Sequence, residues 1–237
     1  MRKKILKIFA VFVVGMIGGI FANQIFWPYL IEKPLFLKYR LEQRPVYLTE
    51  KKEVFIQENT ALQNAIEQVE KAVIGIRTET SKGEILEGSG LVVASDGLIV
   101  TLAELVPFGS KFSFFVEGEP QKYEILKRDL NSNLALIKIG KNNLGTVSFG
   151  DMDKIRRGQR VFLVGTLFNE KPEKIVGEGI ISFFDEETIF TNISENRLLK
   201  GSPLFDIEGK ALGLSKIGDD GNAFAIPISV IQSFISL

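Results

Sequence analysis

Short β-type runs fill the chain from Ala72 to its C-terminus, and this pattern restricts the fold more than any other feature of the sequence. Each run is rich in β-branched, aliphatic and aromatic residues, and Gly, Asp and Asn turns separate the runs. They read AVIGIRTE, GLVVA, LIVTLAEL, KFSFFVE, KYEILKR, LALIKI, RVFLVGT, KIVGEGIISFF, TIFTNI, KALGLSKI and AFAIPI. Roughly a dozen short strands in about 165 residues predict an all-β domain made of barrels or a sandwich.

A short amphipathic helix is expected just before these strands. The segment Asn59–Lys71 places apolar Leu62, Ile66 and Val69 at helical spacing. Its first two residues are Asn and Thr, which are both favourable N-cap residues.

The N-terminus has the pattern of a single transmembrane helix. Basic residues crowd Met1–Lys7, and no charged residue occurs from Ile8 to Ala22. The 23 residues from Ile5 to Trp27 would reach about 34 Å as a helix, enough to cross the hydrocarbon core. Trp27 and Tyr29 would then lie in the far headgroup layer.

A cleaved secretory signal peptide is the alternative, since it also has a basic start and an apolar centre. Cleavage after Ala22 would place Ile20, rather than a small residue, three positions before the cut, so we favour a retained anchor. Basic residues also follow the segment, so the charge rule alone does not set its orientation. We favour a cytoplasmic N-terminus and a domain outside the cytoplasm, because the N-terminal charges directly adjoin the apolar run.

The sequence therefore divides into an anchor (1–27), a juxtamembrane linker (28–52) and a β domain (53–237). The linker holds three prolines and a PLFLKYRL stretch that mixes apolar and basic residues. Three interpretations of this stretch are open: contact with the membrane surface, packing against protein, and a plain tether.

Two absences restrict the chemistry. The 237 residues include no Cys and no His, which excludes disulfides, thiol nucleophiles, imidazole bases and imidazole–metal sites. Eight Lys/Arg and three Glu in residues 1–50 give that part a net charge of +5, and the other 187 residues carry −5. Neither part has the dense basic stripe that a phosphate backbone needs, so we expect no nucleic-acid partner. We also expect no metal and no cofactor.

Five blocks of the β domain together resemble the HtrA/Deg group of trypsin-like serine proteases. In order they are EGSGLVVASDGLIVTLAELV, SNLALIKI, FGDMDKIRRGQRVFLVGT, LLKGSPLFDIEGKALGLSKI and AFAIPISVI. The resemblance implies a double six-stranded β-barrel with a cleft between the barrels. A peptide-binding PDZ domain usually follows in this family, and we expect none here because the sequence ends at Leu237.

The resemblance also places the family's catalytic triad, and all three members differ. The general-base His falls on Glu104, the orienting Asp on Asn133 and the nucleophilic Ser on Lys200. The oxyanion-hole region falls on Leu198, Leu199, Gly201 and Ser202, with Leu198 in place of a glycine. A carboxylate is a much weaker base than imidazole for activating a hydroxyl, so we expect no hydrolysis by the trypsin mechanism.

We expect Glu104 and Lys200 to form an ion pair across the former active site, with Asn133 hydrogen-bonded to the Glu104 carboxylate. The alternative is that both charged side chains point into solvent. One enzyme hypothesis remains, in which Ser202 and Lys200 act as a Ser-Lys dyad. A structural Ser at a turn is the simpler interpretation of Ser202.

A peptide-binding edge is expected at Leu214, Ser215 and Lys216, because the resemblance implies that this strand offers backbone groups to an extended substrate. We therefore interpret the chain as a membrane-anchored, extracytoplasmic pseudoprotease that binds a protein or an extended peptide as a scaffold or regulator. The alternatives are an unconventional serine peptidase and an inactive subunit of an HtrA-like oligomer, a trimer by family analogy.

Overall fold

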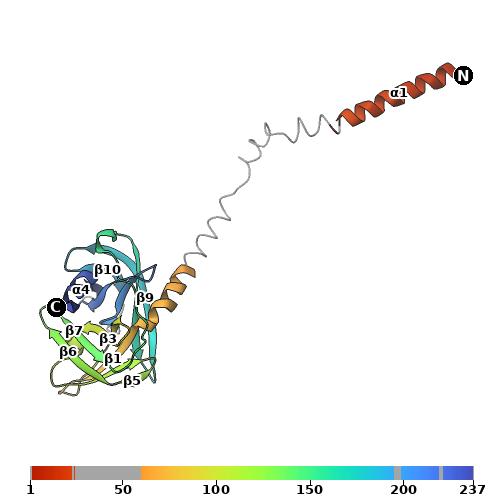
Figure 1. Ribbon diagram of the computed structural model, residues 1–237. Coiled ribbons are helices and arrows are strands. Elements are labelled where there is room, and N and C mark those ends of the chain that lie inside the picture. Colours follow the sequence, from red (N-terminus) through yellow and green to blue (C-terminus); the bar gives the residue numbers. More distant parts are fainter. Residues whose placement is uncertain (1, 23, 25–59, 195–198, 219–220, 237) are drawn as a thin grey trace. The chain divides into compact units, whose positions relative to one another are not determined.

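The computed structural model describes residues 2–22, 24, 60–194, 199–218 and 221–236 (Figure 1). Contacts divide the chain into two compact units, Met1–Ile56 and Gln57–Leu237. The expected boundaries at residues 27/28 and 52/53, the linker between them, and Trp27 and Tyr29 all lie outside the described residues.

The first unit contains helix α1, Arg2–Phe21. Within α1 the 19 residues Lys3–Phe21 are long and apolar enough to cross a membrane, by length and composition alone. Its apolar side chains are mostly exposed within the described residues: Ile8 is 71% exposed and Val11 73% exposed. A retained anchor and a signal sequence both fit this helix.

The second unit opens with the expected amphipathic helix. Residues 60–69 are α-helical and continue into the 3-10 turn η2, Glu70–Ala72. Val69 is fully buried, and Leu62 and Ile66 pack against the core of the unit. The helical spacing read from the sequence therefore marks the face that is buried.

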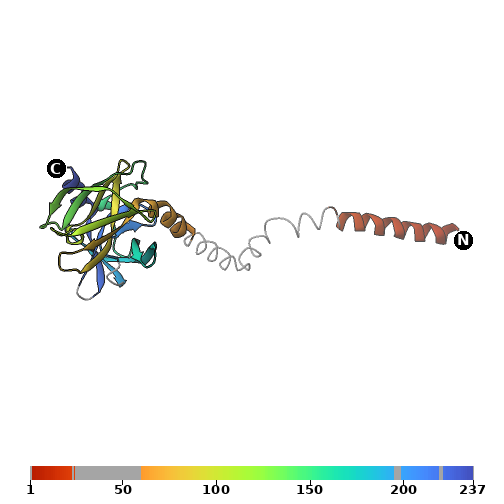
Figure 2. The ribbon, with the colours of Figure 1, turned by 90° about the horizontal axis from the view of Figure 1, so that it is seen from below.

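The first sheet has seven antiparallel strands in the order β5-β4-β1-β2-β3-β7-β6. In chain order they are β1 (Val73–Glu79), β2 (Ile85–Ala94), β3 (Leu98–Leu102), β4 (Lys111–Val116), β5 (Glu119–Gln121), β6 (Tyr123–Asp129) and β7 (Leu134–Ile139). The 3-10 turn η3, Ala103–Leu105, follows β3. Figure 2 shows these strands from below.

The all-β fold expected from the sequence is confirmed, but this sheet differs from the expected six-stranded barrel. Its edge strands β5 and β6 are not paired, so the sheet stays open. The edge strand β5 has three residues and includes Pro120, which has no N–H to donate to a further strand. Ring packing bridges the gap instead, since Tyr123 of β6 contacts Phe112 and Phe114 of β4.

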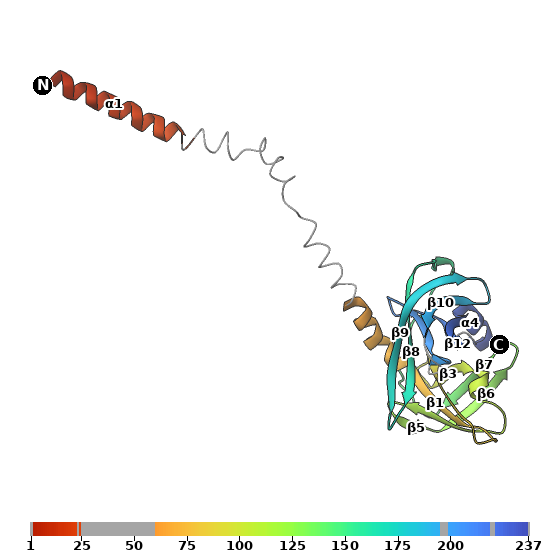
Figure 3. The ribbon, with the colours of Figure 1, turned by 180° about the vertical axis from the view of Figure 1, so that it is seen from behind.

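The second sheet is a closed barrel in the order β10-β13-β12-β11-β8-β9 (Figure 3). In chain order its strands are β8 (Arg160–Phe168), β9 (Pro172–Phe184), β10 (Ile189–Ser194), β11 (Pro203–Asp206), β12 (Ala211–Ile217) and β13 (Asn222–Pro227). The expected six-stranded barrel is thus present here. Closure leaves none of these strands as a free edge along its paired length.

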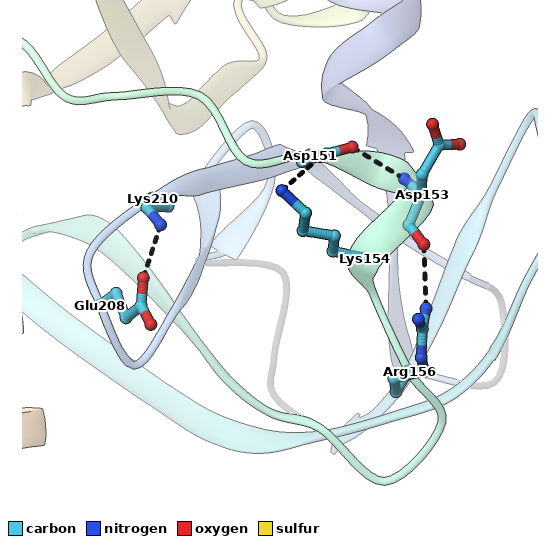
Figure 4. A network of polar contacts seen from close by, with 6 residues as sticks. All are labelled: Asp151, Asp153, Lys154, Arg156, Glu208 and Lys210. Atoms are coloured by element: carbon cyan, nitrogen blue, oxygen red, sulfur yellow. Dashed lines mark hydrogen bonds and ion pairs between the residues drawn. The ribbon is translucent and has the colours of Figure 1, made fainter.

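The connection between the sheets is held by local charges (Figure 4). It contains the 3-10 turn η4, Met152–Lys154, whose N-cap Asp151 accepts a hydrogen bond from the Asp153 N–H at 3.1 Å. The Asp151 carboxylate also pairs with Lys154 Nζ at 3.0 Å, and hydrogen bonding from Lys154 is the main cause that lowers the pKa of Asp151. These contacts fix the entry into β8.

One hydrophobic core joins the two sheets. Phe162 and Phe205 of the barrel are fully buried in the same cluster as Phe114 and the other interior residues of the first sheet. The C-terminal helix α4, Ile228–Ile235, adds Ile231 and Phe234 to this cluster. This shared core packs the two sheets against each other, so that a site can draw residues from both.

Candidate functional site

The three former triad positions come from three segments that meet at the junction of the sheets. Glu104 lies in η3, Asn133 in the turn between β6 and β7, and Lys200 in the segment between β10 and β11. The Ala103 N–H donates to the Asn133 carbonyl at 3.0 Å, which ties η3 to the β6–β7 turn. The first sheet therefore supplies two positions and the barrel supplies the third.

The expected ion pair is present. Lys200 Nζ lies 3.7 Å from Glu104 Oε1, and the two side chains are 32% and 41% exposed. The pair links the first sheet to the barrel where the family has its nucleophile and base. Because both side chains keep contact with water, their attraction is partly screened.

Asn133 does not bond the Glu104 carboxylate as expected. Its Oδ1 instead accepts the backbone N–H of Glu104 at 3.0 Å. The first N–H groups of a helical turn lack partners within the turn, and the N-cap residue of η3, Leu102, supplies no side-chain acceptor. Asn133, which adopts a left-handed backbone with φ 53°, fills this need from the neighbouring turn.

The backbone around Lys200 is fixed from β2. The fully buried Ser89 donates its N–H to the Lys200 carbonyl at 2.9 Å, and its Oγ accepts the N–H of Thr166 at 2.8 Å. Ser89 thereby connects the site to both β2 and β8. Sequence analysis did not identify this residue; its only signal is the Gly-Ser-Gly triplet within a strand pattern.

Gly201 has to be glycine. Its φ is +68°, and a Cβ there would lie 2.4 Å from the Ser89 carbonyl oxygen. Its N–H donates to the Ser215 carbonyl at 2.8 Å, and the next N–H, of Ser202, donates to the Leu199 carbonyl at 3.2 Å. These two amides of the expected oxyanion-hole region thus already donate to carbonyls of the protein. Leu199 is buried, and Leu198 lies outside the described residues.

Ser202 is not arranged as a nucleophile. Its side chain is fully buried, and its Oγ has no hydrogen-bond partner within the described part of the chain. A Ser-Lys dyad needs the amine within hydrogen-bond reach of a hydroxyl that substrate can approach. Lys200 pairs with Glu104 instead.

The expected peptide-binding edge is mostly occupied by the barrel itself. Leu214 and Ser215 are fully buried. The Ser215 N–H donates to the Ser202 carbonyl at 2.8 Å, while β13 pairs along the other side of β12. Barrel closure therefore removes this edge at Leu214 and Ser215. Of the three expected residues only Lys216 is partly exposed, and its Nζ lies 5.2 Å from the centre of the Phe224 ring.

Two exposed apolar residues lie on the connections that carry Glu104 and Asn133. Phe108 follows η3 and is 73% exposed, and Leu130 opens the β6–β7 turn and is 72% exposed. The guanidinium of Arg128, near the end of β6, lies 4.5 Å from the centre of the Phe108 ring. Sequence analysis missed both residues, although a large apolar residue within a turn was their visible signal.

Comparison with known proteins agrees with this architecture. A protein of Halomonas elongata named "Probable periplasmic serine endoprotease DegP-like" is 31% identical over 158 residues, which are 60% of this chain and 33% of that protein. Proteins with the same name from Bartonella henselae and Rhizobium meliloti are 28% and 30% identical, over 62% and 63% of this chain and 32% of each relative. The chain thus matches about a third of the length of these relatives.

The closed six-stranded barrel, and the three former triad positions drawn from both sheets, agree with a trypsin-like domain. The sequence model of the trypsin-like peptidase domain matches residues 88–214, more than half of the chain. The chain belongs to this family, as a member of its HtrA/Deg type.

Proposed function

We propose that the chain is a membrane-anchored pseudoprotease that binds a protein or an extended peptide as a scaffold or regulator. The observation that supports this most strongly is the Glu104–Lys200 ion pair at the positions of base and nucleophile. An ammonium group held by a carboxylate has no free electron pair with which to attack a carbonyl. With no His in the chain, no imidazole is available to activate another nucleophile.

The unconventional peptidase alternative has less support. It requires Ser202 Oγ to reach both Lys200 and a substrate, and the side chain is fully buried. Movement of the Gly201 segment would have to break the bonds to Ser89 and Ser215 that hold it. A binding role needs no such movement.

We place the binding surface on the connections beside the former active site. Phe108 and Leu130 are large and apolar, and both are mostly exposed there. Arg128, stacked on Phe108, adds a positive charge. This combination suits a partner segment that carries apolar side chains next to an acidic group.

We further propose that the β domain works outside the cytoplasm. Relatives are named as periplasmic, and α1 is long and apolar enough to span a membrane. The basic residues that directly precede the apolar run favour a cytoplasmic N-terminus, although basic residues also follow it.

Binding and cleavage of one fluorescent unfolded protein, labelled casein, test this function together. The full chain in nanodiscs is expected to raise the anisotropy of the casein and to leave it intact on a gel. Phe108→Ser and Leu130→Ser together should weaken binding, while Ile207→Ser, at an exposed apolar residue of the β11–β12 turn, should not. Cleaved casein, or equal binding by all variants, would contradict the proposal.

A further inference from the structure

Strand β6 is the longer of the two edge strands that the described sheets leave open. The barrel is closed, and the first sheet ends at β5 on one side and at β6 on the other. β5 has three residues and includes Pro120, whereas β6 has seven, Tyr123–Asp129. β6 lies at the margin of the domain in two opposite views (Figure 1, Figure 3). An edge strand of this length can pair with a further strand.

The backbone of β6 has hydrogen-bonding groups to spare. Among the described residues it pairs with β7 alone, and no backbone hydrogen bond joins it to another segment. In an antiparallel pair, alternate residues direct their N–H and C=O groups away from the partner strand, so about half of the β6 residues present such groups outward. An extended backbone offers donors and acceptors at the same repeat, so it is the occupant that this edge fits.

Exposed apolar side chains lie along the second half of this edge. Leu126, the extra residue of a β-bulge, is 49% exposed. Leu130, directly after β6, and Phe108, whose ring contacts Arg128 of β6, are mostly exposed. At the first half, the ring of Tyr123 packs on rings of β4 instead. A strand added beside the second half of β6 would therefore cover apolar surface as well as backbone groups.

Arg128 sets the charge of the partner. Its guanidinium lies 4.5 Å from the centre of the Phe108 ring and forms no ion pair with a described residue. Its Nε is buried, which leaves the terminal nitrogens for a carboxylate. Of the other charged residues of β6, Lys127 and Asp129 each have a hydrogen-bond partner, and Glu124 lies near the opposite end of the strand. The charge at this half of the edge therefore favours an acidic residue on the partner.

We propose that the partner binds as an extended strand beside the second half of β6, with an acidic residue at Arg128 and an apolar residue two positions away. The two-residue step matches the spacing of Arg128 and Leu130, because side chains two apart in a strand lie on one face. This inference rests on the proposed function, for which it supplies the binding mode and the class of partner segment. It places the peptide on the first sheet and not on β12, whose edges the closed barrel occupies.

The probe is a fluorescein-labelled peptide of seven residues, with threonine at the odd positions, valine at the second and sixth, and glutamate at the fourth. Its pattern is the same in both directions, so it fits a parallel or an antiparallel partner strand. With the full chain in nanodiscs, we expect the anisotropy of the peptide to rise. The analogue with glutamine in place of glutamate should bind about threefold to tenfold more weakly, because a charge-assisted hydrogen bond is lost. No binding of the glutamate peptide would overturn the proposal.

Backbone N-methylation separates strand pairing from side-chain contact. One analogue is methylated at the second, fourth and sixth residues of the peptide, and the other at the third and fifth. Because only one of these sets of N–H groups faces β6 in a paired strand, one analogue should lose at least about tenfold in affinity and the other should keep most of it. Equal affinity of the two analogues would overturn the pairing.

Variants of the chain test the charge. Arg128→Gln should weaken binding of the glutamate peptide about threefold to tenfold and leave the glutamine analogue unchanged. Lys82→Gln, at an exposed position of the β1–β2 turn, is the matched control and should change neither. An equal loss for both peptides in Arg128→Gln would contradict the role of the charge.

Labelled casein keeps this inference distinct from the proposed function. If casein binds and the glutamate peptide does not, the strand-pairing mode is overturned and the binding function stands. If neither binds, both are overturned.

Discussion

A double-mutant cycle on the Glu104–Lys200 pair gives the most detailed prediction. Glu104→Gln and Lys200→Gln each remove one charge, and the double variant removes both. At 3.7 Å two unit charges attract by about 1 kcal/mol in water and by about 4–5 kcal/mol at an effective dielectric constant of 20. Both side chains are about a third or more exposed, so we expect the lower end, a coupling free energy of about 0.5–1 kcal/mol.

The assay is urea unfolding of residues 57–237, followed by circular dichroism at low salt and at 1 M salt. The coupling should largely disappear at high salt, where the screening length falls to about 3 Å. The pair Lys111–Glu79, at 3.9 Å and with side chains 85% and 54% exposed, is a matched control and should couple less. Zero coupling for Glu104–Lys200 at low salt would refute the claim that this pair links the sheets.

Three further predictions follow from the packing and the charges. Gly201→Ala should destabilise the domain by about 1–3 kcal/mol more than Gly158→Ala, because both have positive φ but only Gly201 has a backbone oxygen 2.4 Å from the added Cβ; equal losses in urea unfolding would contradict this. Phe114→Ala should cost about 3–5 kcal/mol, whereas Phe108→Ala, at a residue 73% exposed, should leave the unfolding midpoint nearly unchanged. Acylation of Lys174 should follow a pKa of about 8. Between pH 8 and 10.5 the Lys174 amine is protonated more fully in the unfolded chain than in the folded one, so the free energy of unfolding should rise with pH more steeply in the natural chain than in Lys174→Gln. The same pH dependence in both proteins would exclude the lowered pKa.

Much of the fold could be predicted because its signals are local. The apolar run of α1 and the spacing of Leu62, Ile66 and Val69 correspond to elements that the structure contains. The open first sheet could not be foreseen, because it depends on where β5 ends and on contacts of Tyr123 with rings of β4. The end of β5 and the contacts of Tyr123 both depend on strand order and not on composition.

The site was predictable in its members but not in all of its bonds. The Glu104–Lys200 pair follows from placing two opposite charges at adjacent positions of a known architecture. The bond from Glu104 N–H to Asn133 depends on an unpaired backbone group, which a side-chain pattern does not display. The hydrogen bond from Lys174 Nζ to the Val73 carbonyl joins β9 to β1 across about a hundred residues of chain, and only the folded strand order brings these two residues together.

Hydrolytic activity tests the central claim most directly. The natural chain would be incubated with unfolded casein and a fluorophosphonate probe, beside the triple variant Glu104→His, Asn133→Asp and Lys200→Ser and an active relative of the DegP-like type. The account predicts no cleavage and no labelling of the natural chain, with labelling of the relative. Cleavage or labelling by the natural chain that Ser202→Ala abolishes would contradict it and would make Ser202 the nucleophile of an active peptidase.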